Sequence, residues 1–452
     1  MHEISFFYGL CFISYLVLKL YSHLTYKAET NLKLPLYLIV LIFLLIVDPF
    51  CATAQNNTFF PSIENVDTTR ANLKNVSPAI RTVPLVDLAD IIFGLFKNKK
   101  IVKNFTGDKP VSKPIFSGIA AIGYSLQTKL AATISGNIAF RPDTITRLST
   151  ITSNATYTQN KQFFWPIQSN IWSRNNRYAF VGDFRYYKYP QSTFGLGSNT
   201  SIDTEDPMDY HFFRFYEFVL RKIKGDFYGG LGYIIDYRWG ISEAGNKNGT
   251  LSDYVRYGGE QKSTSSGITV NGIFDTRDNP INPIGGVYVS AQLRNNLKLI
   301  GSNTNWRSLI IDLRKYFLLT KRTQNVLAIW SYNWLVLNGR PPYLDLPSNG
   351  WDSYSSTGRG YIQGRFRGSQ MVYAEAEFRY RISSNGLLGG VLFANAESFS
   401  AEQGGLLQKV QPGAGVGLRI KIKKTSRTNL DIDYGFGTQG SKGLFIAVGE
   451  YF

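Results

Sequence analysis

The chain of 452 residues has only two cysteines and three histidines. Both cysteines, Cys11 and Cys51, precede residue 55, where we expect the mature chain to begin. The mature chain would then have no thiol, which excludes a disulfide framework and a thiolate metal site. Its one histidine would be His211, and a lone histidine in a predicted strand is more often structural than a ligand. We therefore predict no metal and no cofactor.

Sequence motifs of common catalytic machineries are missing as well. The chain has no G-x-S-x-G nucleophile elbow, no Walker A loop and no H-E-x-x-H zinc motif. A glycine-rich stretch at 413–417 lies within an alternating strand pattern and opens no helix, so we interpret it as small residues beside an inserted loop. Glu375, Glu377 and Glu397 leave a carboxylate-only hydrolase open, but charge pairs with arginines are the better interpretation. We predict that the protein is not an enzyme.

Long apolar runs are also missing after Cys51, so no transmembrane helix is expected there, although 44% of the residues are hydrophobic. Acidic residues are outnumbered, since 49 Lys and Arg against 32 Asp and Glu give a net charge of +17. The basic residues are spread over predicted strands and turns rather than gathered on one helix, so we predict no nucleic-acid binding. Lipid phosphates or an anion-selective lumen fit this charge better.

Long stretches of alternating polar and apolar side chains are what the sequence does contain. From Gln370 to Ile382 the alternation is almost without error: from Val372 on, apolar or aromatic residues at even positions alternate with mostly charged residues at odd positions. The same pattern recurs at residues 227–241 and 410–422. We count about 16 candidate strands between Pro114 and Phe452. Many are longer than the strands of soluble sheets, and a bilayer-crossing strand needs about nine to eleven residues.

The lengths of these strands and of their links separate two interpretations. In a soluble β-sandwich the apolar face packs in a core, whereas in an outer-membrane barrel it meets lipid and the charged face lines the lumen. The predicted strands are long, and short links mostly alternate with longer ones, as in bacterial barrels. We therefore predict an all-β fold for residues 114–452, a transmembrane antiparallel β-barrel of about 16 strands.

The N-terminal region has features of an export signal. An apolar run from Leu34 to Val47 is followed by small residues up to Ala54, so we interpret residues 1–54 as a signal peptide. A membrane anchor is the alternative. A second apolar stretch lies upstream and is unusual before a signal peptide. We hypothesise that residues 1–30 are an extension of the reading frame and that the true start lies near Leu32 or Leu34.

Residues 55–113 are predicted to be a periplasmic linker. Apolar residues within 84–100 fall on one helical face just before a group of lysines, which predicts a short amphipathic helix. Such a helix would rest on the inner leaflet or cap the periplasmic mouth of the barrel. A linker with chance periodicity is the alternative.

Two short motifs carry the most specific signal in the chain. One is an Arg-Gly-Tyr loop before the strand at 370–382, and the other is a D-x-R-D turn followed by proline and glycine. The loop motif comprises Gly358, Arg359, Gly360 and Tyr361, and the turn motif includes Asp275, Arg277, Asp278 and Pro280. With a last strand ending at Phe452, they resemble the BamA/TamA-type outer-membrane assembly and translocation superfamily, the bacterial surface antigen barrels. The resemblance covers residues 114–452.

The resemblance implies a barrel in the outer membrane of a diderm bacterium, with the arginine loop inserted in the lumen and Phe452 as a C-terminal barrel signal. In that family the loop arginine pairs with the acid of a G-x-x-F-x-D-x-G strand motif. Residues 390–397 match this motif, but Asn395 replaces the aspartate and Glu397 replaces the last glycine. The expected partner of the arginine therefore changes.

Glu397 is our predicted replacement for the missing charge. Residues 395 and 397 point to the same side of a strand, about 7 Å apart. Because a buried guanidinium is costly without a carboxylate, we predict an Arg359–Glu397 ion pair, with Asn395 as a neutral hydrogen-bond partner. Glu375 and Glu377 are expected to face the same lumen as further partners of the loop.

The resemblance also implies a function. Barrels of this family assist insertion or translocation of protein or lipid, and we expect a weak seam between the first and last strands. Residues 55–113 are too few for a typical POTRA module, so client delivery would need periplasmic or outer-membrane partner proteins. The alternative is a passive or substrate-specific outer-membrane pore without an assembly role.

Overall fold

The computed structural model describes residues 85–88, 90–91, 114–125, 128–143, 145–353, 355–424 and 427–452. The predicted signal peptide, residues 1–54, lies outside the described residues, as does most of the predicted linker. The chain divides into two compact units, and the description below concerns the second, Asp87–Phe452.

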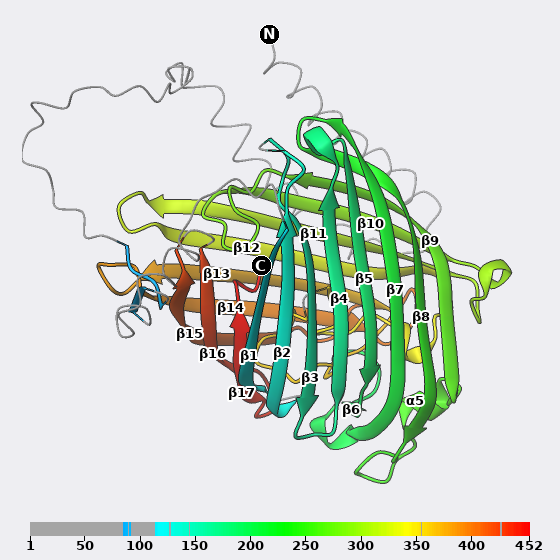
Figure 1. Ribbon diagram of the computed structural model, residues 1–452. Coiled ribbons are helices and arrows are strands. Elements are labelled where there is room, and N and C mark those ends of the chain that lie inside the picture. The colour runs from blue at the N-terminus through cyan, green and yellow to red at the C-terminus, as the bar shows by residue number, and fades with distance from the viewer. Residues whose placement is uncertain are drawn as a thin grey trace, which may run out of the picture. The chain divides into compact units, whose positions relative to one another are not determined.

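Sixteen antiparallel strands, each paired with the next along the chain, form the described part of this unit (Figure 1). A three-residue strand, β6, pairs with the start of β7. The strands are β1 Ile115–Ser125, β2 Lys129–Phe140, β3 Ser149–Thr158, β4 Phe163–Trp172, β5 Tyr178–Lys188, β6 Gln191–Thr193, β7 Asp206–Lys224, β8 Phe227–Glu243, β9 Lys262–Asp275, β10 Gly286–Asn296, β11 Trp306–Thr320, β12 Asn325–Gly339, β13 Gln370–Arg381, β14 Leu388–Ser400, β15 Gln411–Lys423, β16 Thr428–Phe436 and β17 Lys442–Val448. The prediction of an antiparallel fold of about 16 strands is confirmed.

Helices are few and short in the described residues. They are η2 Arg174–Asn176, η3 Ile202–Thr204, α5 Asp253–Arg256, η4 Lys298–Ile300 and η5 Tyr343–Asp345. Each lies in a link between strands, so the strands alone build the wall of the fold. No helix within the described ranges has both the length and the apolar character needed to cross a membrane.

Burial along the strands is inverted relative to a soluble protein. In β13, the carboxylate-bearing Glu377 is 0% exposed, whereas its apolar neighbour Phe378 is 36% exposed. The same inversion holds in β16, where Asp433 is fully buried and Tyr434 is exposed. Because charged residues are rarely buried without partners, the strands must enclose a polar interior and turn their apolar faces outward. This arrangement excludes the alternative of a sandwich with an apolar core.

The two ends of the sheet carry different links. At one end, here called the turn end, short links such as 321–324 and 424–427 join the strands. The other end, here called the loop end, carries the longer links 244–261 and 340–369. The first and last strands, β1 and β17, lie side by side (Figure 1). No ladder hydrogen bond joins these two strands among the residues that the structure describes.

The predicted amphipathic helix at 84–100 is not confirmed, because only six of its residues are described. Within them, the Asp87 carboxylate accepts from the backbone N–H of Asp90 at 2.9 Å, and the Asp90 carboxylate accepts from that of Asp87 at 3.0 Å. Such reciprocal bonds are typical of a helix start. Lys424, in a link at the turn end, donates its backbone N–H to Asp87 at 2.9 Å and its ammonium to Asp90 at 2.8 Å.

Candidate functional site

The loop between β12 and β13, residues 340–369, lies inside the fold. Residues 341–350 are all buried, and so are 356–361 and 364–369. Surface loops are normally exposed, so this degree of burial shows that the loop is folded into the polar interior of the sheet. An isolated bridge joins Arg367 to Ser348 and holds the loop's two branches together, and a second bridge joins Arg367 to Gly197 in the link between β6 and β7.

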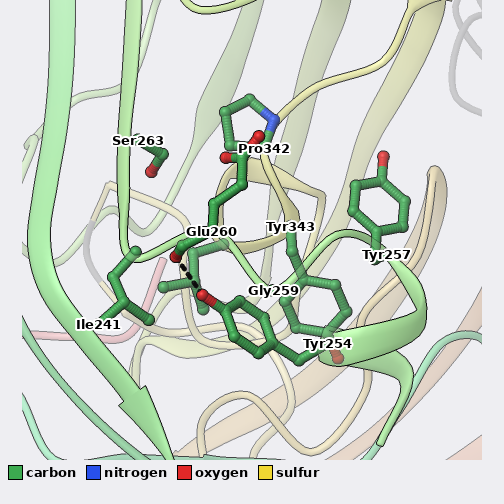
Figure 2. A pocket seen from close by; sticks show the side chains of 9 residues that line it. Ile241, Tyr254, Tyr257, Gly259, Glu260, Ser263, Pro342 and Tyr343 are labelled. Carbon is green, nitrogen blue, oxygen red and sulfur yellow. Dashed lines mark hydrogen bonds between the residues drawn. The ribbon is translucent and has the colours of Figure 1, made fainter.

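Aromatic side chains pack around the base of this loop at the loop end. The ring of Tyr343 meets those of Tyr254 and Tyr257 with centroids 5.4 and 5.7 Å apart (Figure 2). Tyr254 donates its hydroxyl to the backbone carbonyl of Glu260 within the same link, which closes the segment that contains α5. The cavity left between these residues measures about 10 Å³. That volume is at the lower limit for one water molecule, so this contact is packing rather than a ligand site.

Two glycines allow the tip of the loop to lie close against the sheet. Gly358 and Gly360 have φ angles of 83° and 106°, which a residue with a Cβ adopts only under strain. A Cβ built on Gly360 would lie 2.6 Å from the Phe436 carbonyl oxygen, and one on Gly413 would lie 2.8 Å from the Arg359 carbonyl oxygen. These close approaches explain why glycines stand both in the loop motif and in β15.

Arg359 stands at the centre of the site and is 2% exposed. Its guanidinium donates to the carboxylates of Glu375 and Glu377 on β13. It also donates to Asp433 on β16 at 2.7 Å. Three buried carboxylates therefore surround one buried cation, so the charge of the arginine is fully compensated.

Aromatic rings complete the surroundings of this guanidinium. Its central carbon lies 3.9 Å from the ring centre of Phe393 and 4.3 Å from that of Tyr451. Such cation–π contacts strengthen when they are desolvated. Tyr361, also of the loop motif, donates its hydroxyl to the Pro412 carbonyl at 2.6 Å and accepts from the Thr438 N–H at 2.9 Å. The loop is thus held by ionic, aromatic and backbone contacts.

Further charged residues extend the cluster toward the turn end. Arg379 donates to Glu377 at 2.7 Å, and Arg419 donates to Asp433 and, at 2.9 Å, to Glu450. The carboxylate of Glu450 also accepts from Asn282 of the β9–β10 turn at 3.0 Å. A continuous chain of polar contacts therefore joins the turn motif region to the loop arginine.

The predicted ion pair between Arg359 and Glu397 is wrong. Glu397 is buried, but neither of its carboxylate oxygens has a hydrogen-bond partner among the described residues. The register explains the difference: Glu375 stands opposite Asn395, whereas Glu397 stands two positions further along, opposite Tyr373. Asn395 does contact the arginine, because its amide donates to the Arg359 backbone carbonyl at 2.9 Å.

Asp433 is a partner of the loop that sequence reasoning missed. It lies on β16, whereas the strand motif used for the prediction, residues 390–397, lies on β14. The available signal was the alternation of Asp431 and Asp433 within an otherwise apolar stretch, which places both carboxylates on the lumen face.

The turn motif forms the link between β9 and β10. Arg277 donates twice to Asp275, at 2.9 Å each, and its guanidinium lies 4.5 Å from the ring centre of Tyr288. Asp278 accepts from two backbone N–H groups of the turn and pairs with Arg427. Partial burial raises the pKa of the Asp278 carboxyl, but these hydrogen bonds outweigh burial and hold the pKa below its usual value. Pro280 is exposed and fixes the turn backbone.

Phe452 lies beyond the end of β17, after Gly449 with a φ of 98°. Its ring is buried and stacks on Trp330 with centroids 5.1 Å apart. Arg379 donates to its carbonyl oxygen at 2.8 Å. The Phe452 side chain therefore contributes to the interior, and its role as a barrel signal stays a prediction.

The chain matches one protein-family model and is similar to several solved structures. The sequence model of the Omp85 superfamily domain matches residues 153–450. Similar solved structures include BamA from Haemophilus ducreyi lacking POTRA domains 1–3, with 13% identity, a TM-score of 0.48, and coverage of 74% of this chain and 70% of that chain. CdiB from Acinetobacter baumannii has 11% identity, a TM-score of 0.49, and coverage of 75% and 60%.

CdiB from Escherichia coli has 12% identity, a TM-score of 0.48, and coverage of 76% of this chain and 63% of that chain. The chain thus spans less than two thirds of the length of either CdiB structure. No curated protein sequence matches the chain.

Proposed function

Because the chain belongs to the Omp85 superfamily, whose barrels reside in the bacterial outer membrane, we propose that it assists insertion or translocation of protein or lipid there. The observation that carries this proposal is the buried loop around Arg359, which occupies the polar interior. A wide diffusion pore would gain nothing from filling its own lumen with a loop held by buried ion pairs. A barrel that must keep one closed conformation until it opens would be stabilised in that conformation by such a loop.

The junction of β1 and β17 supports a lateral route for the client. Strand β1 is 11 residues long and pairs with β2 along its length, whereas β17 has only 7 residues. In lipid, unpaired backbone groups are costly and are driven to find a partner strand. A client strand that added to one of these edges would satisfy those groups, so the junction is the proposed site of insertion.

Outer-membrane lipid and periplasmic or outer-membrane partner proteins are the proposed partners. We propose no catalytic step and no nucleic-acid ligand. The second candidate function is a substrate-specific pore without an assembly role. It is favoured by a polar cavity of about 360 Å³ within the interior, because a passive lumen needs such a space.

Disulfide closure of the junction tests the proposal. Cysteine pairs scanned along β1 and β17 would be oxidised in a variant whose two native cysteines are replaced, and insertion of a reporter barrel into proteoliposomes would be measured. We expect closure to stop insertion and reduction to restore it. The matched control is a disulfide between Ser135→Cys and Asn154→Cys, which face each other across the complete β2–β3 ladder.

Single-channel current provides the second measurement. If closure leaves reporter insertion unchanged while the protein conducts ions, the assembly proposal fails and the pore function replaces it. If the β2–β3 control stops insertion equally, the effect comes from rigidity of the whole barrel and the proposed route is wrong.

A further inference from the structure

A second polar site, separate from the Arg359 cluster, lies in the interior. It is a cavity of about 360 Å³. Residues 351–353 of the inserted loop line it, together with residues of β3, β4, β5, β7, β9, β10, β11 and β12. None of the charged partners of Arg359 lines it. Its volume falls in the range of small-molecule sites, about 300–1,000 Å³. The cavity is therefore large enough for an organic ligand.

The charges in the cavity wall are balanced and already engaged. Three carboxylates and three guanidinium groups line the cavity: Asp183, Asp312, Asp352, Arg214, Arg294 and Arg314. Two of the arginines share the buried Asp236, at 2.9 and 2.8 Å. The remaining lining charges have partners of their own, including an Arg314–Asp312 pair at 2.6 Å. Each lining charge thus already has an ion-pair or hydrogen-bond partner, and a charged ligand would have to compete with that partner, which favours a neutral ligand.

Neutral hydrogen-bonding groups and aromatic faces make up much of the remaining wall. Gln168 and Asn170, successive lumen-facing residues of β4, make no side-chain hydrogen bond among the described residues. Gln292 of β10 donates to Asn271 at 3.1 Å and keeps its carbonyl oxygen as an acceptor. The aromatic rings of Tyr216, Tyr332 and Trp334 stand in the same wall.

Unsatisfied donors in the wall point to the same kind of ligand. The indole N–H groups of Trp334 and Trp351 and the hydroxyl of Ser308 are buried and have no hydrogen-bond partner within the described residues. Buried polar groups without partners are rare in folded proteins. A ligand with acceptor oxygens would supply the partners that these donors lack.

We propose that this cavity binds a neutral polyhydroxylated ligand of one or two sugar units. Sugar hydroxyls match the amide and hydroxyl groups of Gln168, Asn170 and Gln292, because each can both donate and accept. The apolar C–H face of a sugar ring packs against aromatic rings, which the wall supplies beside these groups. Phosphorylated or carboxylated sugars are disfavoured, because they would have to compete with the carboxylates that the lining arginines already contact. The site is independent of the proposed insertion function.

The test measures binding of maltose, cellobiose and chitobiose to the purified full chain in detergent, by calorimetry and tryptophan fluorescence. Glucose 6-phosphate and glucuronate are the charged comparators. We expect saturable binding of at least one neutral disaccharide and at least tenfold weaker binding of both charged sugars. Absence of binding by all three disaccharides, or equal binding of the charged sugars, would overturn the proposal and leave a water-filled lumen.

Matched variants locate the binding to the cavity. Gln168→Leu and Asn170→Leu keep side-chain volume but remove the amides, and we expect each to weaken binding at least tenfold. Gln261→Leu removes an exposed amide at the loop end, outside the cavity wall, and is expected to change nothing. Circular dichroism and the heat-dependent gel mobility of the barrel verify folding of each variant. Unchanged affinity in folded Gln168→Leu and Asn170→Leu would place any binding elsewhere and refute the site.

Discussion

Replacement of Arg359 by alanine is expected to destabilise the barrel by about 3–5 kcal/mol, the usual cost of leaving one buried charge without its partner. The guanidinium contacts three carboxylates, but two of these keep a second arginine, Arg379 or Arg419. Only Glu375 loses its one cationic partner within the described residues. The expected cost is therefore that of one uncompensated carboxylate, not of three.

The double variant Arg359→Ala/Glu375→Gln separates this explanation from a simple loss of packing. It removes the uncompensated charge together with the arginine, so we expect it to be more stable than Arg359→Ala alone by about 2 kcal/mol or more. The matched control is Arg307→Ala, since Arg307 is an exposed arginine that donates only to an asparagine side chain among the described residues. We expect that control to lie within about 0.5 kcal/mol of the parent protein.

Urea unfolding of the purified protein in lipid vesicles, followed by tryptophan fluorescence, measures these free energies. A decrease in the free energy of unfolding of less than about 1 kcal/mol in Arg359→Ala would contradict the buried-charge reasoning. It would mean that the Glu375 carboxylate left without its arginine is not costly. A double variant no more stable than the single one would show that packing of the loop, rather than the charge of Glu375, sets the effect.

Two further substitutions test the loop tip and the N-terminal contact. Gly360→Ala forces a Cβ against a strand carbonyl, so we expect the rate of protease cleavage within 340–369 to rise at least tenfold. The control is Gly225→Ala: Gly225 also has a positive φ but has open space around it, so this variant should leave the loop resistant to protease. Lys424→Gln removes the ammonium that contacts Asp90, so hydrogen exchange at 85–91 should accelerate, while no more than about 1 kcal/mol of stability is lost because the pair is partly exposed. Partial burial raises the pKa of Asp90, but the hydrogen bonds from Lys424 and from the Asp87 N–H lower this pKa more. The Lys424–Asp90 contact should therefore persist above pH of about 4 and weaken only as the pH falls through the lowered pKa of Asp90. Hydrogen-exchange protection of residues 85–91 that is unchanged in Lys424→Gln would contradict a stabilising Lys424–Asp90 contact. Protection that is lost as the pH rises from 5 to about 8 would contradict it as well.

Strand positions and lumen-facing side chains were predictable because a strand has a period of two. In β13 every charged residue at an odd position was expected to face the interior, and Glu375 and Glu377 are buried there. Each such residue is placed by its own neighbours along the chain, so no knowledge of distant segments is needed. The glycine-rich stretch 413–417 was likewise expected to lie beside an inserted loop, and a Cβ on Gly413 would lie 2.8 Å from the Arg359 carbonyl oxygen.

The partners of the loop were less predictable, because they depend on which distant strands the loop tip reaches. Sequence proximity within one strand motif favoured Glu397, but the tip lies against Asp433 of β16 and the middle of β13. A shift of two positions along a strand moves a side chain by about 7 Å, more than twice the length of a hydrogen bond.

By itself, the sequence determined that the chain forms two-faced strands of membrane-crossing length around a polar interior, because alternation is local and encoded residue by residue. Only the tertiary structure decided which carboxylates meet Arg359, that Phe452 turns inward, and that a neutral cavity lies beside the inserted loop. These features arise where segments far apart in the chain converge, and their geometry depends on strand register and loop path rather than on any local pattern.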